Sequence, residues 1–135
     1  MSKIPDSLQC VVVTPERTLF DETVEFVALP LFDGEIGIAP GRAPLIGRLG
    51  YGELRTSKAG TIRRYFLDGG FAQVRDNVVT VLTNRAIAAD QIETGAAAAE
   101  LERAKARATK NEVEQAEKTQ AVDRARAQIR VASHR

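Results

Sequence analysis

The alternation of apolar and polar residues changes character near residue 89. Before that point, Val, Ile, Leu and Phe come in short runs separated by Gly, Pro, Asp and Asn, a spacing typical of short antiparallel strands. After it there is no proline, a single glycine and mostly Ala, Glu, Lys, Arg and Gln, which is a helix-forming composition. We therefore expect a β domain over residues 1–88 and a helical domain over residues 89–135.

Eight strands are expected in the first part, besides a short piece around Ile36. Pro15 suits the second position of a type I turn, Gly60 offers a positive φ that closes a hairpin, and the pair 76–77 (Asp-Asn) tolerates a type I′ turn. The expected strands are residues 8–14, 18–22, 24–29, 45–49, 52–56, 61–67, 71–75 and 78–83. Two packed sheets would hide this many strands, so an antiparallel β-sandwich is favoured over a closed barrel.

The second part carries two signals for the start of a helix. Residues 90–93 (Asp-Gln-Ile-Glu) and 111–114 (Asn-Glu-Val-Glu) both have the spacing of a capping box, in which the first side chain accepts from a free amide. A second start so late in the segment implies a reversal at residues 109–111. We expect an antiparallel two-helix hairpin, with a single long helix or a coiled-coil strand as the alternative.

The apolar stripes of these two helices are made mostly of alanine. Leu101, Val122 and Ile129 are their only large apolar side chains, and burying each one contributes roughly 1.5–3 kcal/mol. Ordering the backbone costs on the order of 1–2 kcal/mol per residue. The hairpin is therefore expected to be held only marginally and to be able to exchange its packing partner.

Composition excludes several classes of protein. The chain has 135 residues, with 19 basic and 18 acidic side chains, so no overall field favours nucleic acid or a membrane surface. No apolar run approaches the roughly 18 residues of a membrane helix. Residues 1–7 lack the apolar core of a signal peptide, and the single cysteine, Cys10, fits a reducing compartment. A soluble cytoplasmic protein is expected.

The residues of familiar catalytic sites are missing. There is no Gly-Lys pair for a P-loop, and the glycine clusters at 50–52 and 69–70 are not followed by a helix. His134 is the only histidine and Cys10 the only cysteine, so no zinc site of ordinary ligands can form. The acidic residues are scattered rather than paired. We expect no catalytic residue, no metal and no cofactor.

One segment combines a rigid backbone with isolated charges. Residues 34–45 read Gly-Glu-Ile-Gly-Ile-Ala-Pro-Gly-Arg-Ala-Pro-Leu, and their three glycines and two prolines fix an irregular path. Glu35 and Arg42 are the only charged residues in it. The segment is suited to presenting a docking surface, although an ordinary crossover loop of a sandwich has the same composition.

Several motifs together are similar to one known family. Besides residues 34–45, the shared motifs are residues 12–20, 69–71, 78–82 and 128–131, the last within an alanine-rich helical tail. The family is the epsilon subunit of F-type ATP synthase, which is called delta in mitochondria, and the resemblance covers residues 8–131. It implies a non-catalytic rotor subunit of the central stalk, bound peripherally at the cytoplasmic face of a bacterial inner membrane.

The resemblance implies partners for the β domain. The sandwich would dock on the gamma subunit and rest on the polar loops of the c-ring, linking them for ATP synthesis coupled to proton transport. Glu35 matches a family acid that contacts the ring. Arg42 stands where the family usually has histidine, so a permanent charge replaces a titratable group and any pH-sensitive contact there is in doubt.

The resemblance also implies a regulatory role for the helical tail. In the family the hairpin lies folded on the sandwich or extends along gamma into the catalytic head, where it blocks ATP hydrolysis. Arg126 and Arg130, with Arg124 as a weaker third, are candidates to face an acidic stretch of a catalytic beta subunit, beside alpha. An ordinary solvated helix face explains these arginines equally well.

Some family members bind ATP on the folded hairpin through the motif Ile/Leu-Asp-x-x-Arg-Ala. Residues 92–97 here read Ile-Glu-Thr-Gly-Ala-Ala. Glu93 thus replaces the aspartate, and Ala96 replaces the arginine that would meet phosphate. We expect ATP binding to be weak or absent.

Two other classes of function are alternatives to a rotor subunit. A free-standing β-sandwich binding module with a helical oligomerisation tail is the main alternative. Aromatic residues make up only 5% of the chain, which counts against sugar binding, and the apolar stripe of the second helix is too broken for a sustained coiled coil. An enzyme is the third class, and it lacks a nucleophile, a metal site and a cofactor cradle.

Overall fold

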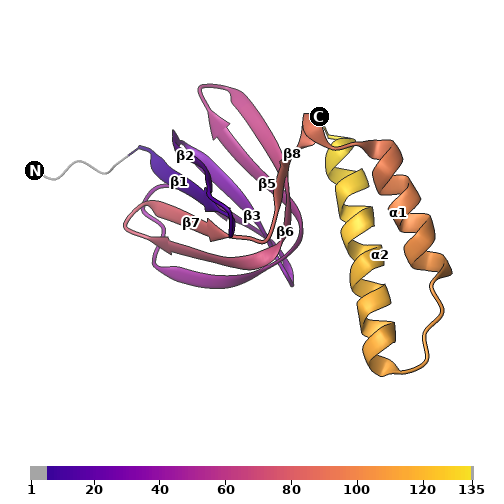
Figure 1. Cartoon of the computed structure of the whole chain (residues 1–135). Coiled ribbons are helices and arrows are strands. Elements are labelled where there is room, and N and C mark those ends of the chain that lie inside the picture. Colours follow the sequence, from indigo (N-terminus) through magenta and orange to yellow (C-terminus); the bar gives the residue numbers. More distant parts are fainter. Residues whose placement is uncertain (1–5, 135) are drawn as a thin grey trace, which may run out of the picture.

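The computed structural model describes residues 6–134, which fold into a β domain followed by two helices (Figure 1). The elements in chain order are β1 (Leu8–Val13), β2 (Thr18–Val24), β3 (Phe26–Leu31), β4 (Gly34–Ile38), β5 (Leu45–Lys58), β6 (Thr61–Arg75), β7 (Val78–Leu82), β8 (Ala86–Ala88), a short 3-10 helix (Ala89–Gln91), α1 (Thr94–Ala106) and α2 (Glu112–Ala132). The expected fold class is confirmed. Expectations for residues 1–5 and 135 fall outside the described range.

The strands are joined in one sheet that folds into two layers. Its order is β2-β1-β7-β6-β5-β3-β4, and β8 pairs with β6 off this path. β7 pairs with residues 71–75 of β6, whereas β8 pairs with residues 65–67 of the same strand. The long strands β5 and β6 therefore run from one layer into the other.

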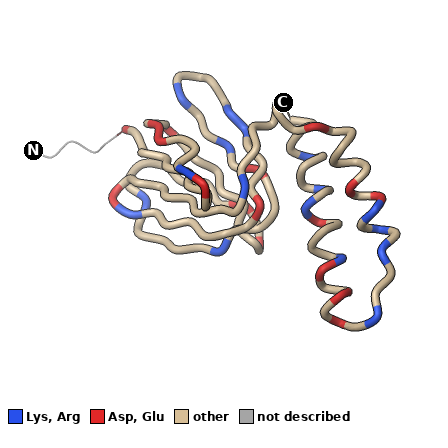
Figure 2. Tube along the Cα trace, viewed as in Figure 1, with Lys and Arg blue, Asp and Glu red and all other residues tan. Residues whose placement is uncertain are grey.

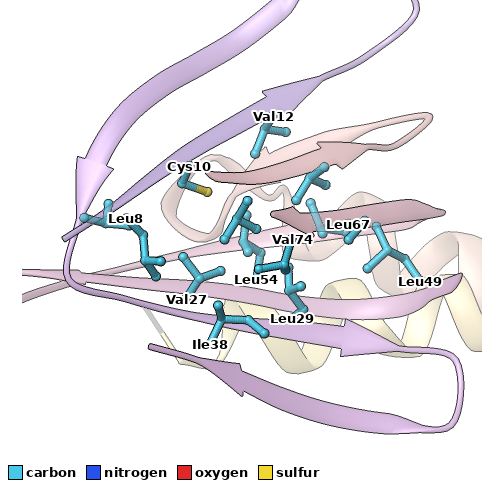
Figure 3. Close-up of a cluster of buried hydrophobic side chains, with 14 residues drawn as sticks. Leu8, Cys10, Val12, Val27, Leu29, Ile38, Leu49, Leu54, Leu67 and Val74 are labelled. Carbon is cyan, nitrogen blue, oxygen red and sulfur yellow. The ribbon is translucent and has the colours of Figure 1, made fainter. Parts of the chain in front are cut away.

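The main core lies between the two layers (Figure 3). Along β1 every second residue is buried, which places Leu8, Cys10 and Val12 inside and leaves the residues between them partly exposed. This alternation is the period of two that a strand covered on one face requires. The other buried residues of this core are Val24, Val27, Leu29, Ile38, Leu49, Leu54, Leu67, Ala72, Val74, Val79 and Val81.

The turns form as their residues predict. The Arg17 N–H donates to the Thr14 carbonyl at 3.2 Å, which closes the turn around Pro15. Gly60 has a φ of 80° at the β5–β6 hairpin, and Asp76 and Asn77 have φ values of 51° and 62°. Positive φ at both central residues is the requirement of a type I′ hairpin.

The expected strand boundaries at 45–49 and 52–56, and at 61–67 and 71–75, are wrong. Each pair is one continuous strand, β5 or β6, because the glycines between them bend the strand rather than end it. At Gly52 a Cβ would lie 2.7 Å from the Pro30 Cβ, so a neighbouring strand approaches closely there. Gly69 and Gly70 have φ values of 68° and 110°, which produce the matching bend in β6.

Two further features differ from the expectation. β8 has only three residues, too few to show a periodic pattern, and it was not anticipated. β1 pairs with β7 in parallel, so the sandwich is not antiparallel throughout. A parallel pair requires a long crossover connection, and here residues 14–77 supply it.

The two helix starts have different outcomes. Asn111 caps α2 as predicted, because its Oδ1 accepts from the Glu114 N–H at 2.9 Å, while Glu114 accepts from the Lys110 N–H. The predicted capping box at residues 90–93 is wrong. Asp90 lies in the 3-10 helix, and α1 begins only at Thr94, after Glu93 with no side-chain cap.

The helices form the expected antiparallel hairpin, and α2 lies between α1 and the sandwich (Figure 1). A second core joins α2 to the sandwich. Its members are Phe66, Ala89, Ile92, Ala127, Val131 and Ala132, with Tyr51 and Ile87 partly buried beside them. Phe66 is the only aromatic residue among the six buried members of this second core and three of the six are alanines, so small residues make much of the contact.

Candidate docking surfaces

The segment 34–45 is divided between a strand and a loop. Its first five residues form β4, which within residues 6–134 pairs with β3 alone at the edge of the sheet, and residues 39–44 leave the sheet. Glu35 lies near the start of β4, opposite Pro30, whereas Arg42 lies in the loop. The strand therefore separates these two charges instead of presenting them together.

Glu35 belongs to a network of charges on the sandwich. Its Oε1 lies 3.1 Å from Arg55 Nη2, and the other guanidinium nitrogen of Arg55 lies 3.4 Å from Glu53 Oε2. The hydrogen bond that Arg55 donates to Glu35 raises the pKa of Arg55 above its ordinary value. The Glu35 side chain is still 51% exposed, so it can meet a partner while it holds Arg55.

The loop that carries Arg42 is fixed to a neighbouring turn. The Gly41 N–H donates to Asn77 Oδ1 at 2.7 Å, which ties the loop to the β6–β7 hairpin. Gly41 has a φ of 85°, a conformation that L side chains rarely adopt. Arg42 is exposed beside this anchored glycine, so the loop presents a permanent positive charge from a defined position.

An apolar surface that the sequence analysis did not single out lies on the outer face of one layer. Ile46, Phe71 and Leu82 are 75%, 57% and 52% exposed, and Phe71 pairs directly with Leu82 across β6 and β7. The inward-facing neighbours Ala72 and Val81 are buried. The sequence did contain a signal for this surface. Between residues 71 and 82, apolar side chains occupy odd-numbered as well as even-numbered positions, which indicates that both faces of these strands are apolar.

The three arginines of α2 do not act alike. Arg124 turns toward the sandwich, where its Nε lies 3.1 Å from Asp68 Oδ1 and its guanidinium lies 5.1 Å from the centre of the Tyr51 ring. Burial lowers the pKa of Arg124, but its hydrogen bond and charge interaction with Asp68 outweigh that effect and raise it overall. Arg126 and Arg130 are exposed.

Arg126 and Arg130 line a groove of about 860 Å³ between α2 and the bend of the sandwich. Arg48 lies on the opposite wall, where its guanidinium is 5.6 Å from the centre of the exposed Phe32 ring. Asp68 and Asp123 also contribute to the wall. Figure 2 shows positive and negative residues interspersed along both helices, so the basic character of the groove is local.

A second cavity, of about 420 Å³, lies between the hairpin and β8. Glu93 and Ala96, the two positions where the nucleotide motif is altered, both line it. Arg85 and Arg124 supply positive charge on its wall, and Glu93 and Glu100 supply negative charge. The cavity therefore has mixed charge, and Ala96 offers no group that could contact a phosphate.

Cys10 is not a reactive group. Burial, together with the negative charges of Glu22 and Asp21, raises the pKa of its thiol to about 12. Within residues 6–134 no three His, Cys, Asp or Glu side chains are grouped so that they could hold a metal ion. None of the helices in that range is both long enough and apolar enough to cross a membrane.

Comparison with known proteins gives consistent matches. A family model described as the ATP synthase delta/epsilon chain, beta-sandwich domain, matches residues 7–89. The ATP synthase epsilon chain of Rhodopirellula baltica is 52% identical over 124 residues, which are 92% of this chain and 97% of that one. The epsilon chain of Nitratidesulfovibrio vulgaris is 37% identical over 127 residues, covering 93% and 95%.

Solved structures show the same fold. A chain of the Euglena gracilis mitochondrial ATP synthase, in a structure of its OSCP, F1 and c-ring, has a TM-score of 0.86 at 23% identity and covers 99% of this chain and 85% of its own length. A chain of the central stalk and c-ring structure of the Tetrahymena thermophila mitochondrial ATP synthase has a TM-score of 0.75 at 11% identity, covering 97% and 99%.

The fold defines a class of protein, a β-sandwich with a small helical hairpin folded against it. The chain belongs to the delta/epsilon family of ATP synthase subunits, of the epsilon type. The relatives that it matches are named as epsilon chains of ATP synthase.

Proposed function

We propose that the chain is a non-catalytic rotor subunit of the central stalk, which links gamma to the c-ring and carries a mobile, inhibitory hairpin. The observation that carries the proposal is the combination of an exposed apolar sheet face with a hairpin held by small residues. The first feature suits a permanent interface and the second suits an element that moves. Support also comes from the relatives, which are named as epsilon chains.

The apolar face of Ile46, Phe71 and Leu82 is proposed to bind gamma. Exposed apolar side chains that gather on one sheet face mark interaction sites in soluble proteins. Large permanent interfaces are richer in apolar area than the remaining surface, as this face is. A partner in the same rotor, which never dissociates during turnover, fits such a face better than a transient one.

Glu35 and Arg42 are proposed to meet the polar loops of the c-ring. Glu35 keeps half of its side chain exposed while it pairs with Arg55, and Arg42 is held outward by the anchored loop. The guanidinium of Arg42 would supply a positive charge and several hydrogen-bond donors to this contact. This arrangement would place the subunit peripherally, on the cytoplasmic face of a bacterial inner membrane.

Residues 1–88 and 89–135 are proposed to act as two units, one for docking and one for regulation. In the extended state Arg126 and Arg130 would face an acidic stretch of a catalytic beta subunit, beside alpha, and so oppose ATP hydrolysis. Both are exposed in the folded state and are available for such a contact. The free-standing binding module has no specific observation in its favour.

Truncation of the chain after Ala89 tests the inhibitory role. The assembled enzyme with the truncated subunit should hydrolyse ATP faster than the complete enzyme, while proton pumping driven by ATP stays coupled. Arg126→Gln with Arg130→Gln in the full chain should give part of the same increase. Hydrolysis that is unchanged by both alterations would argue against an inhibitory tail.

A further inference from the structure

The sandwich face beneath α2 carries a compact patch of two aromatic and two acidic side chains. In the β5–β6 ladder Tyr51 lies opposite Asp68 and Glu53 lies opposite Phe66, so all four project from one face. Phe66 is fully buried, and the side chains of Asp68 and Glu53 are only 15% and 12% exposed. We call these four residues the receptor patch.

α2 presents a stripe that matches this patch. At 100° per residue, Arg124, Ala127, Val131 and His134 fall within about 80° of arc, the last in the turn that continues the helix. Arg124 contacts Tyr51 and Asp68, Ala127 and Val131 pack in the core of Phe66, and His134 Nδ1 lies 2.9 Å from Glu53 Oε1. Each part of the patch therefore has its own partner on the stripe.

Arg126 and Arg130 lie away from that stripe. Measured from its centre, Arg126 is about 120° and Arg130 about 80° around the helix. Both are exposed, whereas Arg124 is partly buried against the sandwich. The three arginines therefore fall into two sets, one facing the sandwich and one exposed on another side of α2.

The two polar contacts, Arg124 with Asp68 and His134 with Glu53, carry much of the docking of α2 because the apolar contact between them is small. Apart from Phe66, the buried members of the second core are three alanines, Ile92 and Val131. Lifting α2 would break the 3.1 Å ion pair between Arg124 and Asp68 and the contact of the guanidinium with the Tyr51 ring. The loss of both interactions opposes the lifting of the helix.

We propose that the receptor patch is a latch for the folded hairpin and that Arg124 is its main positioning residue, acting against inhibition rather than in it. The inference rests on the proposed function, because it concerns the regulation of the same hairpin. It predicts effects of opposite sign. Arg124→Gln or Asp68→Asn should lower ATP hydrolysis by releasing the hairpin, whereas Arg126→Gln should raise it.

The latch can be tested on the isolated full-length chain. Ala127→Cys places a thiol in the buried contact, and native Cys10 stays silent because it is buried with a pKa of about 12. The rate at which a thiol reagent modifies Cys at position 127 then reports how often α2 lifts. In this background Arg124→Gln and Asp68→Asn should each raise the rate by about three- to tenfold.

Three controls fix the interpretation. Arg126→Gln is the matched arginine outside the stripe and should leave the rate unchanged. The double variant with Arg124→Gln and Asp68→Asn should be no faster than either single variant, because both remove one interaction. Arg124→Lys should restore part of the protection, since it keeps the charge but loses the planar contact with Tyr51. If Ala127→Cys itself weakens docking, Ala132→Cys provides a second buried reporter.

Equal rates in the parent, Arg124→Gln and Asp68→Asn backgrounds would overturn the latch. Additive effects in the double variant would overturn the pairing of these two residues. Faster modification with no change in hydrolysis by the assembled enzyme would leave the latch standing and would count instead against the inhibitory role of the hairpin. The two proposals therefore fail in different measurements.

Discussion

Cys10 lies in the centre of the sandwich core with no exposure to solvent, and its thiol pKa is raised to about 12. Because this value is above that of an unfolded thiol, ionisation favours the unfolded chain. The Cys10 contribution to stability is complete below pH 9 and is lost as the pH rises toward 12. Unfolding by urea at several pH values should show a steeper loss of stability above pH 9 than the Cys10→Ala variant shows.

Thiol reactivity gives an independent check on Cys10. The native chain at pH 8 should react with a thiol reagent far more slowly than the chain in concentrated urea, because modification requires unfolding. Complete modification of the native chain within the mixing time would show that Cys10 is accessible.

Gly70 occupies a position where any side chain would clash with the backbone of a neighbouring strand. Its φ is 110°, and a Cβ there would lie 1.9 Å from the Leu82 carbonyl oxygen, a backbone atom that cannot move aside. Gly70→Ala should lower the free energy of unfolding by about 2–4 kcal/mol. Gly41→Ala is the matched control, because φ at Gly41 is also positive but no atom lies where the new Cβ would be placed. This variant should lower the free energy of unfolding by about 1 kcal/mol. Equal losses in urea unfolding would refute the steric explanation.

At the scale of single residues, local chemistry was predictable and long-range contacts were not. Asp76 and Asn77 adopt positive φ because a two-residue hairpin demands it, and their sequence alone indicates this. Arg124 meets Asp68 across 56 residues of sequence, so its partner depends on how α2 docks. For that reason the sequence placed Arg124 with Arg126 and Arg130, although the structure separates them.

The cavity between the hairpin and β8 leads to a prediction about ATP. Because Ala96 supplies no cation and Glu93 adds negative charge, the isolated chain should give no heat of binding with ATP at micromolar concentrations in calorimetry. The double variant Glu93→Asp with Ala96→Arg restores the motif on the cavity wall and should bind more tightly. Micromolar affinity of the unmodified chain would contradict this expectation.

Elements were predictable where one local signal decides them. Asn111 caps α2 because its side chain reaches a free amide three residues later, whatever the rest of the fold does. Residues 90–93 have the same pattern, but the 3-10 helix Ala89–Gln91 includes the first two of them, and α1 begins only at Thr94. Similarly, the glycines in β5 and β6 allow either a turn or a bend, and only the packing of the two layers selects the bend.

At the scale of the whole molecule, three surfaces are proposed to make three different contacts. The outer face of Phe71 and Leu82 is apolar, the loop of Arg42 presents a fixed charge, and the receptor patch holds α2. Figure 1 shows the hairpin extending past the sandwich on one side, attached through the segment after β8. Movement of the hairpin would thus leave the sandwich free to keep its own contacts.

The most direct test of the rotor assignment is co-purification of the tagged full-length chain with its partners from detergent-solubilised membranes. The native chain should retrieve gamma, the catalytic subunits and the c-ring. Phe71→Ser with Leu82→Ser should lose gamma and with it the whole complex, whereas Ile62→Ser, a residue that is 51% exposed elsewhere on the sandwich, should keep both. Arg42→Glu should retain gamma and weaken the c-ring contact. Retrieval of neither gamma nor the c-ring by the native chain, or full retrieval by the Phe71 and Leu82 variant, would contradict the account.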